Sequence, residues 1–356
     1  MKKKNLRILS LFAGCGGMDL GFLMADHPSL CYNVAWANDF EKDACETYKK
    51  NIDDKIICED IWAVNFEKVP NADVVIGGFP CEDFSIVRGD TRPGFGSKRG
   101  LLYTRFVDLV SIKRPMIFVA ENVKGLLSAM KGEAIKKIIE DFSLAGGIGY
   151  DITYKLINFA DYGVPQTRER VIIVGIRKDL KIKFEFPMPT HKGKHVSTKV
   201  ALKGVENVIA NNEKLKMADS TREKLELIPP GGNYKNLPQY SEKNWMSLIY
   251  KRLDPNLPSP TIVAAGGGGT WGYHFAEHRS LTNRERARLQ TFPDNFVFIG
   301  STTEVRRQIG NAVPPLGIKP IAEKLLNSLD DVAVKRKIKA VKKTKLKAKQ
   351  MKLLGV

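Results

Sequence analysis

The sequence predicts an α/β fold, with a doubly wound sheet covered by helices on both faces and a smaller, irregular second domain. Short apolar runs alternate with helix-like stretches over about the first 180 residues, which is the pattern of repeated strand–helix units. From about residue 187 the chain is rich in Pro, Gly, Asn and Lys, and breakers such as Pro229–Gly232 and Gly266–Gly269 interrupt it. Helix signals return at Thr282. A length of 356 residues suits about two domains.

The apolar runs predict seven strands, and the stretches between them predict helices. The expected strands are Ile8–Phe12, Val34–Ala37, Lys55–Cys58, Val74–Ile76, Met116–Ala120, Ile152–Phe159 and Val171–Ile176. The expected helices are Met18–Ala25, Lys42–Lys50, Leu102–Ile112, Glu133–Leu144 and Leu316–Leu329, with another opened by a capping box at Thr282–Glu285. Strand–helix alternation favours a parallel sheet, which binds ligands at the carboxyl ends of its strands.

These patterns divide the chain into four segments: a first domain over residues 1–186, a second over 187–280, a return at 281–330 that completes the first, and a basic, flexible tail over 331–356. The net charge is +18. Asp330–Val356 holds ten Lys and Arg and two Asp, which leaves +10 for the rest of the chain. Such a balance favours a polyanionic partner through counterion release, although a solubilising surface explains the same charge.

Composition argues against several classes of protein. No run approaches the ~18 apolar residues that a membrane span needs, and the N-terminus lacks the apolar stretch of a secretory signal. The five cysteines, with no C-x-x-C pair among them, argue against a disulfide framework or a zinc ribbon and favour a reducing compartment. The sequence therefore predicts a cytoplasmic protein without a membrane segment or a metal.

A glycine-rich turn after the first expected strand predicts a ligand site. Residues 12–17 lie between a strand and a helix, as a nucleotide-binding turn does, and Gly14 and Gly16 let a ligand approach the backbone. Asp19 stands where the dinucleotide fingerprint needs a glycine, and its charge would repel a pyrophosphate. It could instead bind the ammonium group of an amino-acid-like ligand.

The ends of the next two strands carry further polar candidates. Asp39 lies where a ribose-binding acid is expected, and Phe40 beside it could cover an adenine. Asp60 and Ile61 end the third strand. An acid at this position is equally well explained as the N-cap of a helix.

Two more strand ends carry groups that could react. Cys81 follows Pro80 on a loop beyond a strand, which is the position of a candidate nucleophile, and the glycine-bearing loop Glu82–Gly100 suggests a lid. Glu121 ends the next strand at the same edge and could act as an acid. A buried structural cysteine and a surface acid are the alternatives. For Cys15, Cys31, Cys45 and Cys58 the buried structural role is favoured.

A short polar segment before the last strand is a candidate anion site. Gln166, Arg168 and Arg170 are spaced so that they share one face of extended backbone. Two arginines on one face suit contacts with phosphates or bases. Ion pairing with glutamates is the alternative.

Six segments in order resemble the cytosine-C5 DNA methyltransferase family of restriction–modification systems. They are Phe-Ala-Gly-Cys-Gly-Gly at 12–17, Pro-Cys at 80–81, Glu-Asn-Val at 121–123, Gln-x-Arg-x-Arg at 166–170, Arg-Leu-Gln-x-Phe-Pro at 288–293 and Gly-Asn-Ala-Val-Pro-Pro at 310–315. Each motif alone is weak, but six at family-like spacing are specific. Two positions depart from the family: Glu82 replaces its usual Gln, and Asn283 stands where Pro or Val is common.

The resemblance implies a Rossmann-like class I methyltransferase fold and methyl transfer from S-adenosylmethionine to C5 of a cytosine flipped out of a specific short sequence in duplex DNA. It implies that Cys81 adds to C6, that Glu121 holds and protonates N3, and that Arg168 and Arg170 support the base and the active-site loop. The implied donor site comprises Phe12, Gly14, Gly16, Asp19, Asp39, Phe40, Asp60, Ile61, Pro80 and Asn311.

The resemblance also assigns residues 187–280 to target recognition. Expected DNA contacts are Ser85, Gln166, Arg252, Thr261, Gly266 and Gly267. Bidentate Arg-to-guanine is the commonest direct readout, although packing or a salt bridge explains Arg252 as well. The basic tail is expected to contact phosphates. A monomer associated with the nucleoid is expected, with a cognate restriction endonuclease acting separately.

Three rival hypotheses remain open from the sequence. A tRNA-modifying member would have little material between the Gln-x-Arg-x-Arg segment and the last motifs, whereas about 90 residues lie there. A non-catalytic DNA-binding module would not need Cys81 and Glu121. A nicotinamide oxidoreductase is disfavoured by Asp19 in the glycine turn and by the missing third glycine.

Overall fold

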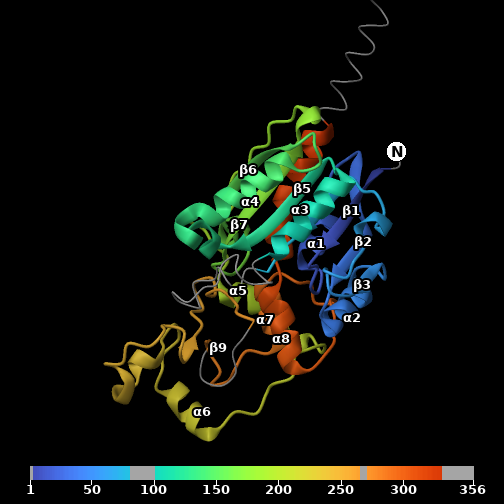
Figure 1. The fold of residues 1–356 in the computed structure, drawn as a ribbon. Coiled ribbons are helices and arrows are strands. Elements are labelled where there is room, and N and C mark those ends of the chain that lie inside the picture. The colour runs from blue at the N-terminus through green and yellow to red at the C-terminus, as the bar shows by residue number, and fades with distance from the viewer. Residues whose placement is uncertain (1–2, 81–100, 265–270, 331–356) are drawn as a thin grey trace, which may run out of the picture.

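The computed structural model describes residues 3–80, 101–264 and 271–330, and one large sheet dominates its upper part (Figure 1). This sheet has seven strands in the order β3-β2-β1-β4-β5-β7-β6. The strands are β1 (Lys4–Leu11), β2 (Leu30–Asp39), β3 (Ile56–Cys58), β4 (Val74–Gly77), β5 (Ile117–Val123), β6 (Tyr150–Asn158) and β7 (Glu169–Arg177). The seven predicted strands are confirmed, with ends that shift by a few residues.

The sheet is mixed, so the prediction of an all-parallel sheet was wrong at one edge. β1 to β5 pair in parallel, but β7 runs antiparallel to both β5 and β6. A parallel crossover needs a dozen or more residues, usually a helix. The connection 159–168 between β6 and β7 is shorter than that, so these two strands form a hairpin.

Helices cover both faces of the sheet and also link it to the lower part of the molecule. They are α1 (Gly17–Leu23), α2 (Lys42–Asn51), α3 (Leu102–Lys113), α4 (Glu133–Leu144), α5 (Thr198–Leu202), α6 (Asp219–Glu226), α7 (Asn283–Leu289) and α8 (Thr302–Asn311). Residues 315–330 form a further helix. Single 3-10 turns occupy Phe66–Lys68, Lys124–Leu127, Ala129–Gly132, Phe159–Tyr162, Lys178–Leu180, Val205–Asn207, Tyr234–Asn236 and Pro238–Tyr240. The predicted capping box of α7 is confirmed, because Thr282 and Glu285 exchange hydrogen bonds.

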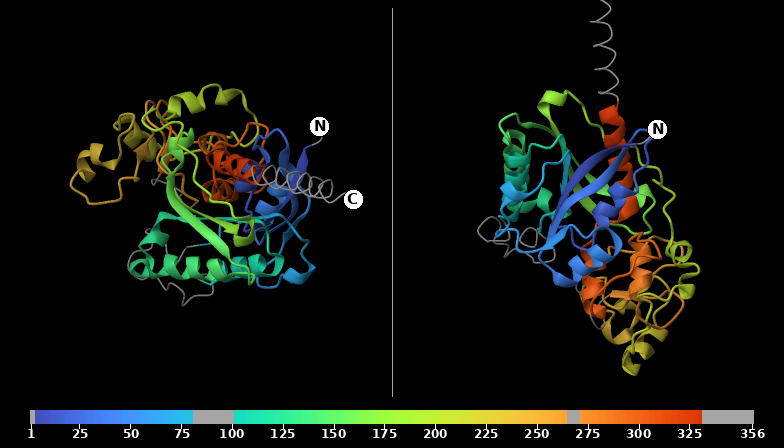
Figure 2. Two further views of the ribbon diagram at one scale, coloured as in Figure 1. Left: turned by 90° about the horizontal axis from the view of Figure 1, so that it is seen from above. Right: turned by 90° about the vertical axis from the view of Figure 1, so that its right-hand side faces the viewer.

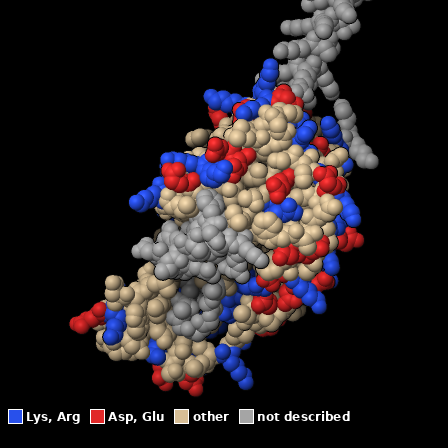
Figure 3. All heavy atoms as spheres, in the orientation of Figure 1, with Lys and Arg blue, Asp and Glu red and all other residues tan. Residues whose placement is uncertain are grey.

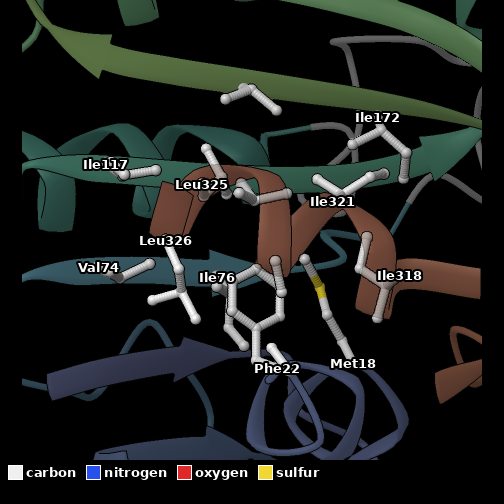
Figure 4. Packing of buried hydrophobic residues seen from close by; sticks show 14 of the residues in the cluster. Met18, Phe22, Val74, Ile76, Ile117, Ile172, Ile318, Ile321, Leu325 and Leu326 are labelled. Atoms are coloured by element: carbon white, nitrogen blue, oxygen red, sulfur yellow. The ribbon is translucent and has the colours of Figure 1, made fainter. Parts of the chain in front are cut away.

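Alternate residues of the central strands pack into two hydrophobic cores, one on each face of the sheet. On one face, Ile117 and Val119 pack with α1 and helix 315–330 (Figure 4). On the other face, Phe118 and Ala120 pack against α3 and α4, and Figure 2 shows these two helical layers on opposite sides of the sheet. Burial on both faces explains why the strands read as nearly continuous apolar runs.

The described part of residues 187–280 contains only short elements. These are α5, α6, three of the 3-10 turns and a small parallel pair of strands, β8 (Lys251–Arg252) and β9 (Trp271–Tyr273). A separate small core holds this region together, and another core joins it to α7 and α8, which lie between it and the large sheet (Figure 1). The exact domain boundaries stay a prediction.

Candidate active site

The candidate site lies at the carboxyl edge of the parallel strands. The chain order reverses beside β1, which pairs with β2 on one side and with β4 on the other. Such a switch point is where doubly wound sheets bind ligands. Residues that follow β1, β2, β4 and β5 therefore reach one edge.

The glycine turn after β1 is built around Gly14. Its N–H donates to Asp39 Oδ2 at 2.7 Å, and its φ of +55° suits glycine. A Cβ added to Gly14 would meet nothing within 4 Å, whereas one on Gly16 would lie 2.8 Å from the Ile52 side chain. Gly16 is thus needed for packing, and Gly14 borders open space. Phe12, also at positive φ and half-buried, begins the turn.

Asp39 is buried and Phe40 is exposed, so the two residues offer a ligand different kinds of contact. The buried carboxylate of Asp39 also accepts from Glu41 N at 3.0 Å. Burial raises the pKa of this carboxyl group, and the two N–H donors oppose that shift. Two of its roughly four lone-pair sites remain for a ligand. Phe40 is 62% exposed, so its ring is free to stack on a planar group.

The remaining donor-site candidates lie around this edge with different exposure. Asp60 is exposed and accepts from Trp62 N at 3.0 Å. This bond closes a turn and not a helix N-terminus, so the N-cap alternative was wrong. Ile61 is buried. Pro80 is half-buried, and Asn311 is exposed at the end of α8.

Asp19 does not face the candidate site, which corrects the expectation that it binds a ligand. Its side chain is fully buried and accepts from Ser10 Oγ at 2.9 Å and Tyr48 Oη at 2.8 Å. Burial raises its pKa to about 6. A strand residue and a helix residue therefore share this carboxyl group beneath the glycine turn.

We expect the pH dependence of stability to report on Asp19. Because its pKa is about 6 in the folded protein and about 3.9 in an unfolded chain, the folded state binds this proton more tightly. Its contribution to stability is therefore full below about pH 4 and is lost as the pH rises through about 6. Relative to the unchanged protein, Asp19→Asn should gain about 2–3 kcal/mol in free energy of unfolding between pH 4 and pH 7 in urea titrations.

A companion variant sharpens this test. The hydrogen bond from the Tyr48 hydroxyl lowers the pKa of Asp19, against the larger effect of burial. Tyr48→Phe removes this bond and should raise that pKa further. The variant should therefore lose more stability than the unchanged protein as the pH rises. A difference between Asp19→Asn and the unchanged protein that does not vary with pH would show that Asp19 ionises as freely as in the unfolded chain.

Glu121 is buried at the end of β5 and forms an ion pair. Arg170 Nε lies 2.9 Å from its Oε1, so it is not the surface acid offered as the alternative. Burial lowers the pKa of Arg170, and the Glu121 carboxylate opposes that shift. A Cβ on Gly78, which follows β4, would lie 3.1 Å from Glu121 Oε2. Glycine at this position therefore keeps the space beside the second carboxylate oxygen clear.

Asn122 is a positioning residue that the sequence reasoning quoted but did not interpret. Its Nδ2 donates to Phe79 O at 3.1 Å, and its Oδ1 accepts from Val123 N at 2.8 Å. The end of β5 thus holds the backbone that leads through Pro80 to Cys81. Its place beside Glu121 in the Glu-Asn-Val motif was the signal available.

Arg168 and Gln166 belong to a buried junction, which corrects their expected roles at the base and the DNA. The guanidinium of Arg168 is 1% exposed and donates to Ile262 O and Gly310 O at 3.2 and 3.0 Å. Gln166 is fully buried and donates to Gln290 Oε1 at 2.7 Å, while its own oxygen accepts from Ile262 N at 2.8 Å. Both side chains therefore join the segment before β7 to Ile262, within the 187–280 region, and to the chain that follows that region.

Two expected DNA contacts are also engaged within the protein. The buried guanidinium of Arg252 donates to four carbonyls, those of Leu225, Ile228, His274 and Phe275. This placement favours the packing role over a base contact. The Thr261 hydroxyl donates to Thr167 O at 2.7 Å, so donating to a phosphate would require it to change acceptor. Cys81, Ser85, Gly266 and Gly267 lie outside the described residues.

Neither the charge on one face nor the metal-ligating groups of the described residues gather at one place. Figure 3 shows Lys and Arg interspersed with Asp and Glu over the described part of one face. Within residues 3–80, 101–264 and 271–330, no three His, Cys, Asp or Glu side chains gather as metal ligands would. No helix in those ranges is long and apolar enough to cross a membrane.

Comparison with known proteins decides the family. A family model described as C-5 cytosine-specific DNA methylase matches residues 6–327. The chain belongs to that family. The Type II methyltransferase M.NgoFVII of Neisseria gonorrhoeae is 50% identical over 337 residues, which cover 91% of this chain and 87% of that protein. The Type II methyltransferase M.BbvI of Brevibacillus brevis is 44% identical over 338 residues, covering 89% and 90%.

A solved structure supports the same assignment. A DNA modification methyltransferase encoded within an Escherichia coli prophage superposes with a TM-score of 0.71 at 26% identity, covering 91% of this chain and 99% of that one. The predicted family, the Rossmann-like α/β fold and the activity of a DNA cytosine-C5 methyltransferase are confirmed.

Proposed function

We propose that this methyltransferase transfers the methyl group of S-adenosylmethionine to C5 of one cytosine, flipped out of a specific short duplex sequence, through a covalent bond between Cys81 and C6. The observation that carries the proposal is the buried Glu121–Arg170 pair beside the backbone that leads to Cys81. A stacked base cannot reach a buried carboxylate, so the cytosine must leave the helix.

The residues around Gly14 fit the donor. The open space beside Gly14 admits a ligand against the backbone, the two free lone-pair sites of Asp39 suit ribose hydroxyls, and the exposed ring of Phe40 suits an adenine face. Bound S-adenosylmethionine supplies an electrophilic methyl group. Nothing in this chemistry needs a metal ion.

Cys81 and Glu121 overcome the low reactivity of cytosine. Carbon 5 is a poor nucleophile, and addition of the Cys81 thiolate to C6 turns it into an enamine-like carbon. Glu121 holds and protonates N3, so negative charge does not build up on the ring. After methylation a base removes the C5 proton, the Cys81–C6 bond breaks, and the thiolate is regenerated.

Arg170 orients Glu121 for this task. Its Nε lies at Oε1, and the missing side chain of Gly78 leaves room at Oε2. We therefore assign the contact with N3 to Oε2. Arg168 acts indirectly, because its hydrogen bonds to Ile262 O and Gly310 O anchor the segment that leads into β7 and Arg170.

The biological role we propose is modification in a restriction–modification system. The relatives from Neisseria gonorrhoeae and Brevibacillus brevis are named Type II methyltransferases, and similarity spans most of this chain and of theirs. The proposed enzyme acts in the cytoplasm on duplex DNA as a monomer. Its methylation protects DNA from a separate cognate endonuclease.

Bisulfite sequencing of DNA from cells that express the protein tests this proposal. We expect one short sequence to carry 5-methylcytosine at a single position, because a base-specific flip selects one cytosine. In vitro, labelled S-adenosylmethionine should transfer its label to duplex DNA and not to tRNA. Label in tRNA alone would overturn the proposed substrate.

A further inference from the structure

Two thiols lie behind the strand end that carries Asp39 and Phe40. Cys45, in α2, donates from Sγ to Asp39 O at 3.5 Å. Cys58, the last residue of β3, donates from Sγ to Phe40 O at 3.7 Å. The two sulfurs thus bind the carbonyls of consecutive residues. We call Cys45 and Cys58 the thiol pair.

The members of the thiol pair are neighbours and differ in exposure. The parallel register places Cys58 opposite Asp39, and the Asp39 carbonyl accepts from Cys45, so the two thiols approach the same strand end. Cys45 is buried, but Cys58 is exposed on the edge strand of the sheet. The expectation that Cys58 is a buried structural cysteine was therefore wrong, since β3 has no neighbour on its outer side.

We infer that the thiol pair is a redox-responsive site, and that its oxidation to a disulfide by a hydroperoxide weakens binding of S-adenosylmethionine. The first half depends only on the geometry of the two cysteines. The second half rests on the proposed donor site at Asp39 and Phe40. Disulfides in cytosolic proteins are usually transient and redox-sensing, which suits a pair with one exposed member.

The reaction proceeds in two balanced steps. Cys58, accessible to solvent, attacks the peroxide: its sulfur takes one oxygen to form a sulfenic acid, and the O–O bond breaks to release water or an alcohol. Cys45 then attacks that sulfur, an S–S bond forms, and a second water leaves. Two thiols lose two electrons and the peroxide gains them. Cys45 is buried and Cys58 is exposed, so the peroxide reaches Cys58 first and Cys45 is the resolving thiol.

A disulfide would disturb the donor site through the backbone. Both sulfurs would give up their hydrogen bonds to Asp39 O and Phe40 O. The same turn holds the Asp39 carboxylate in place for Gly14 N. Loss of two hydrogen bonds corresponds to about a tenfold change in an equilibrium, so we expect the Kd for S-adenosylmethionine to rise about tenfold.

The test uses full-length protein carrying Cys81→Ala, which removes a third reactive thiol without touching the thiol pair. After treatment with hydrogen peroxide, peptide mass spectrometry should find the Cys45 and Cys58 peptides joined and lighter by two hydrogens. Calorimetric titration with S-adenosylmethionine should show about a tenfold weaker Kd, restored by dithiothreitol. Cys58→Ser should abolish both effects, whereas Cys31→Ser, at another accessible cysteine, should change neither.

The outcomes separate this inference from the proposed function. Reduced protein that does not bind S-adenosylmethionine would overturn the donor site itself. Reduced protein that binds it, with no Cys45–Cys58 disulfide after oxidation, would overturn the thiol pair as a redox site. A disulfide that leaves the Kd unchanged would overturn its coupling to the cofactor.

Discussion

Replacing Cys81 by alanine should abolish methylation while binding of S-adenosylmethionine survives. C5 of cytosine gains its nucleophilic character only when a thiolate adds to C6, and alanine offers no such group. The donor site assigned to Gly14, Asp39 and Phe40 lies at the carboxyl ends of β1 and β2 and does not include the sulfur. Transfer of label to cognate duplex DNA should fall to background, and calorimetry should give an unchanged Kd.

A trapped complex provides the positive control for Cys81. Duplex DNA with 5-fluorocytosine at the target cannot lose a proton from C5 after methylation, so the Cys81–C6 bond should persist through denaturing electrophoresis. Cys58→Ser, which removes a different accessible thiol, should still trap. A covalent complex formed by Cys81→Ala would place the nucleophile elsewhere in the chain.

Much of the fold could be predicted because both faces of the sheet are buried. Apolar runs such as Val74–Ile76 and Met116–Ala120 are nearly continuous. Strands have this pattern when helices cover both faces of their sheet, because every side chain is then buried. The direction of β7 could not be derived from its own residues, since antiparallel and parallel strands have the same composition there. Only the short connection 159–168 carried that signal.

For the candidate site, the sequence predicted which residues lie at the strand ends but not how their side chains are oriented. Strand-end position correctly brought Asp39 and Glu121 to one edge, because parallel strands end together. Motif membership did not reveal orientation: Asp19, Gln166 and Arg168 belong to motifs but are buried against partners distant in sequence, such as Tyr48 and Gln290. Those partners lie 29 and 124 residues away, and no local pattern links them.

Glu121→Gln should slow methylation by about 10²-fold or more, the usual scale of general acid catalysis. Glutamine keeps the shape of the side chain and can still accept from Arg170, but it cannot transfer a proton to N3. Single-turnover transfer of label at saturating S-adenosylmethionine measures the chemical step directly. Glu169→Gln is the matched control, because Glu169 is a partly exposed glutamate on β7, next to Arg170, that pairs with Lys124. Its rate should not change.

The Glu121 variant also needs a measurement that separates catalysis from stability. Removing the carboxylate leaves the buried Arg170 guanidinium without its counter-charge, and breaking such an ion pair typically costs about 3–5 kcal/mol. Glu121→Gln combined with Arg170→Gln relieves that buried charge and should recover part of the lost stability in urea unfolding. It should not recover the rate, because the proton donor is still missing. Recovery of the rate together with the stability, or an unchanged rate in the single variant at neutral pH, would remove Glu121 from the chemistry and leave it as a structural partner of Arg170.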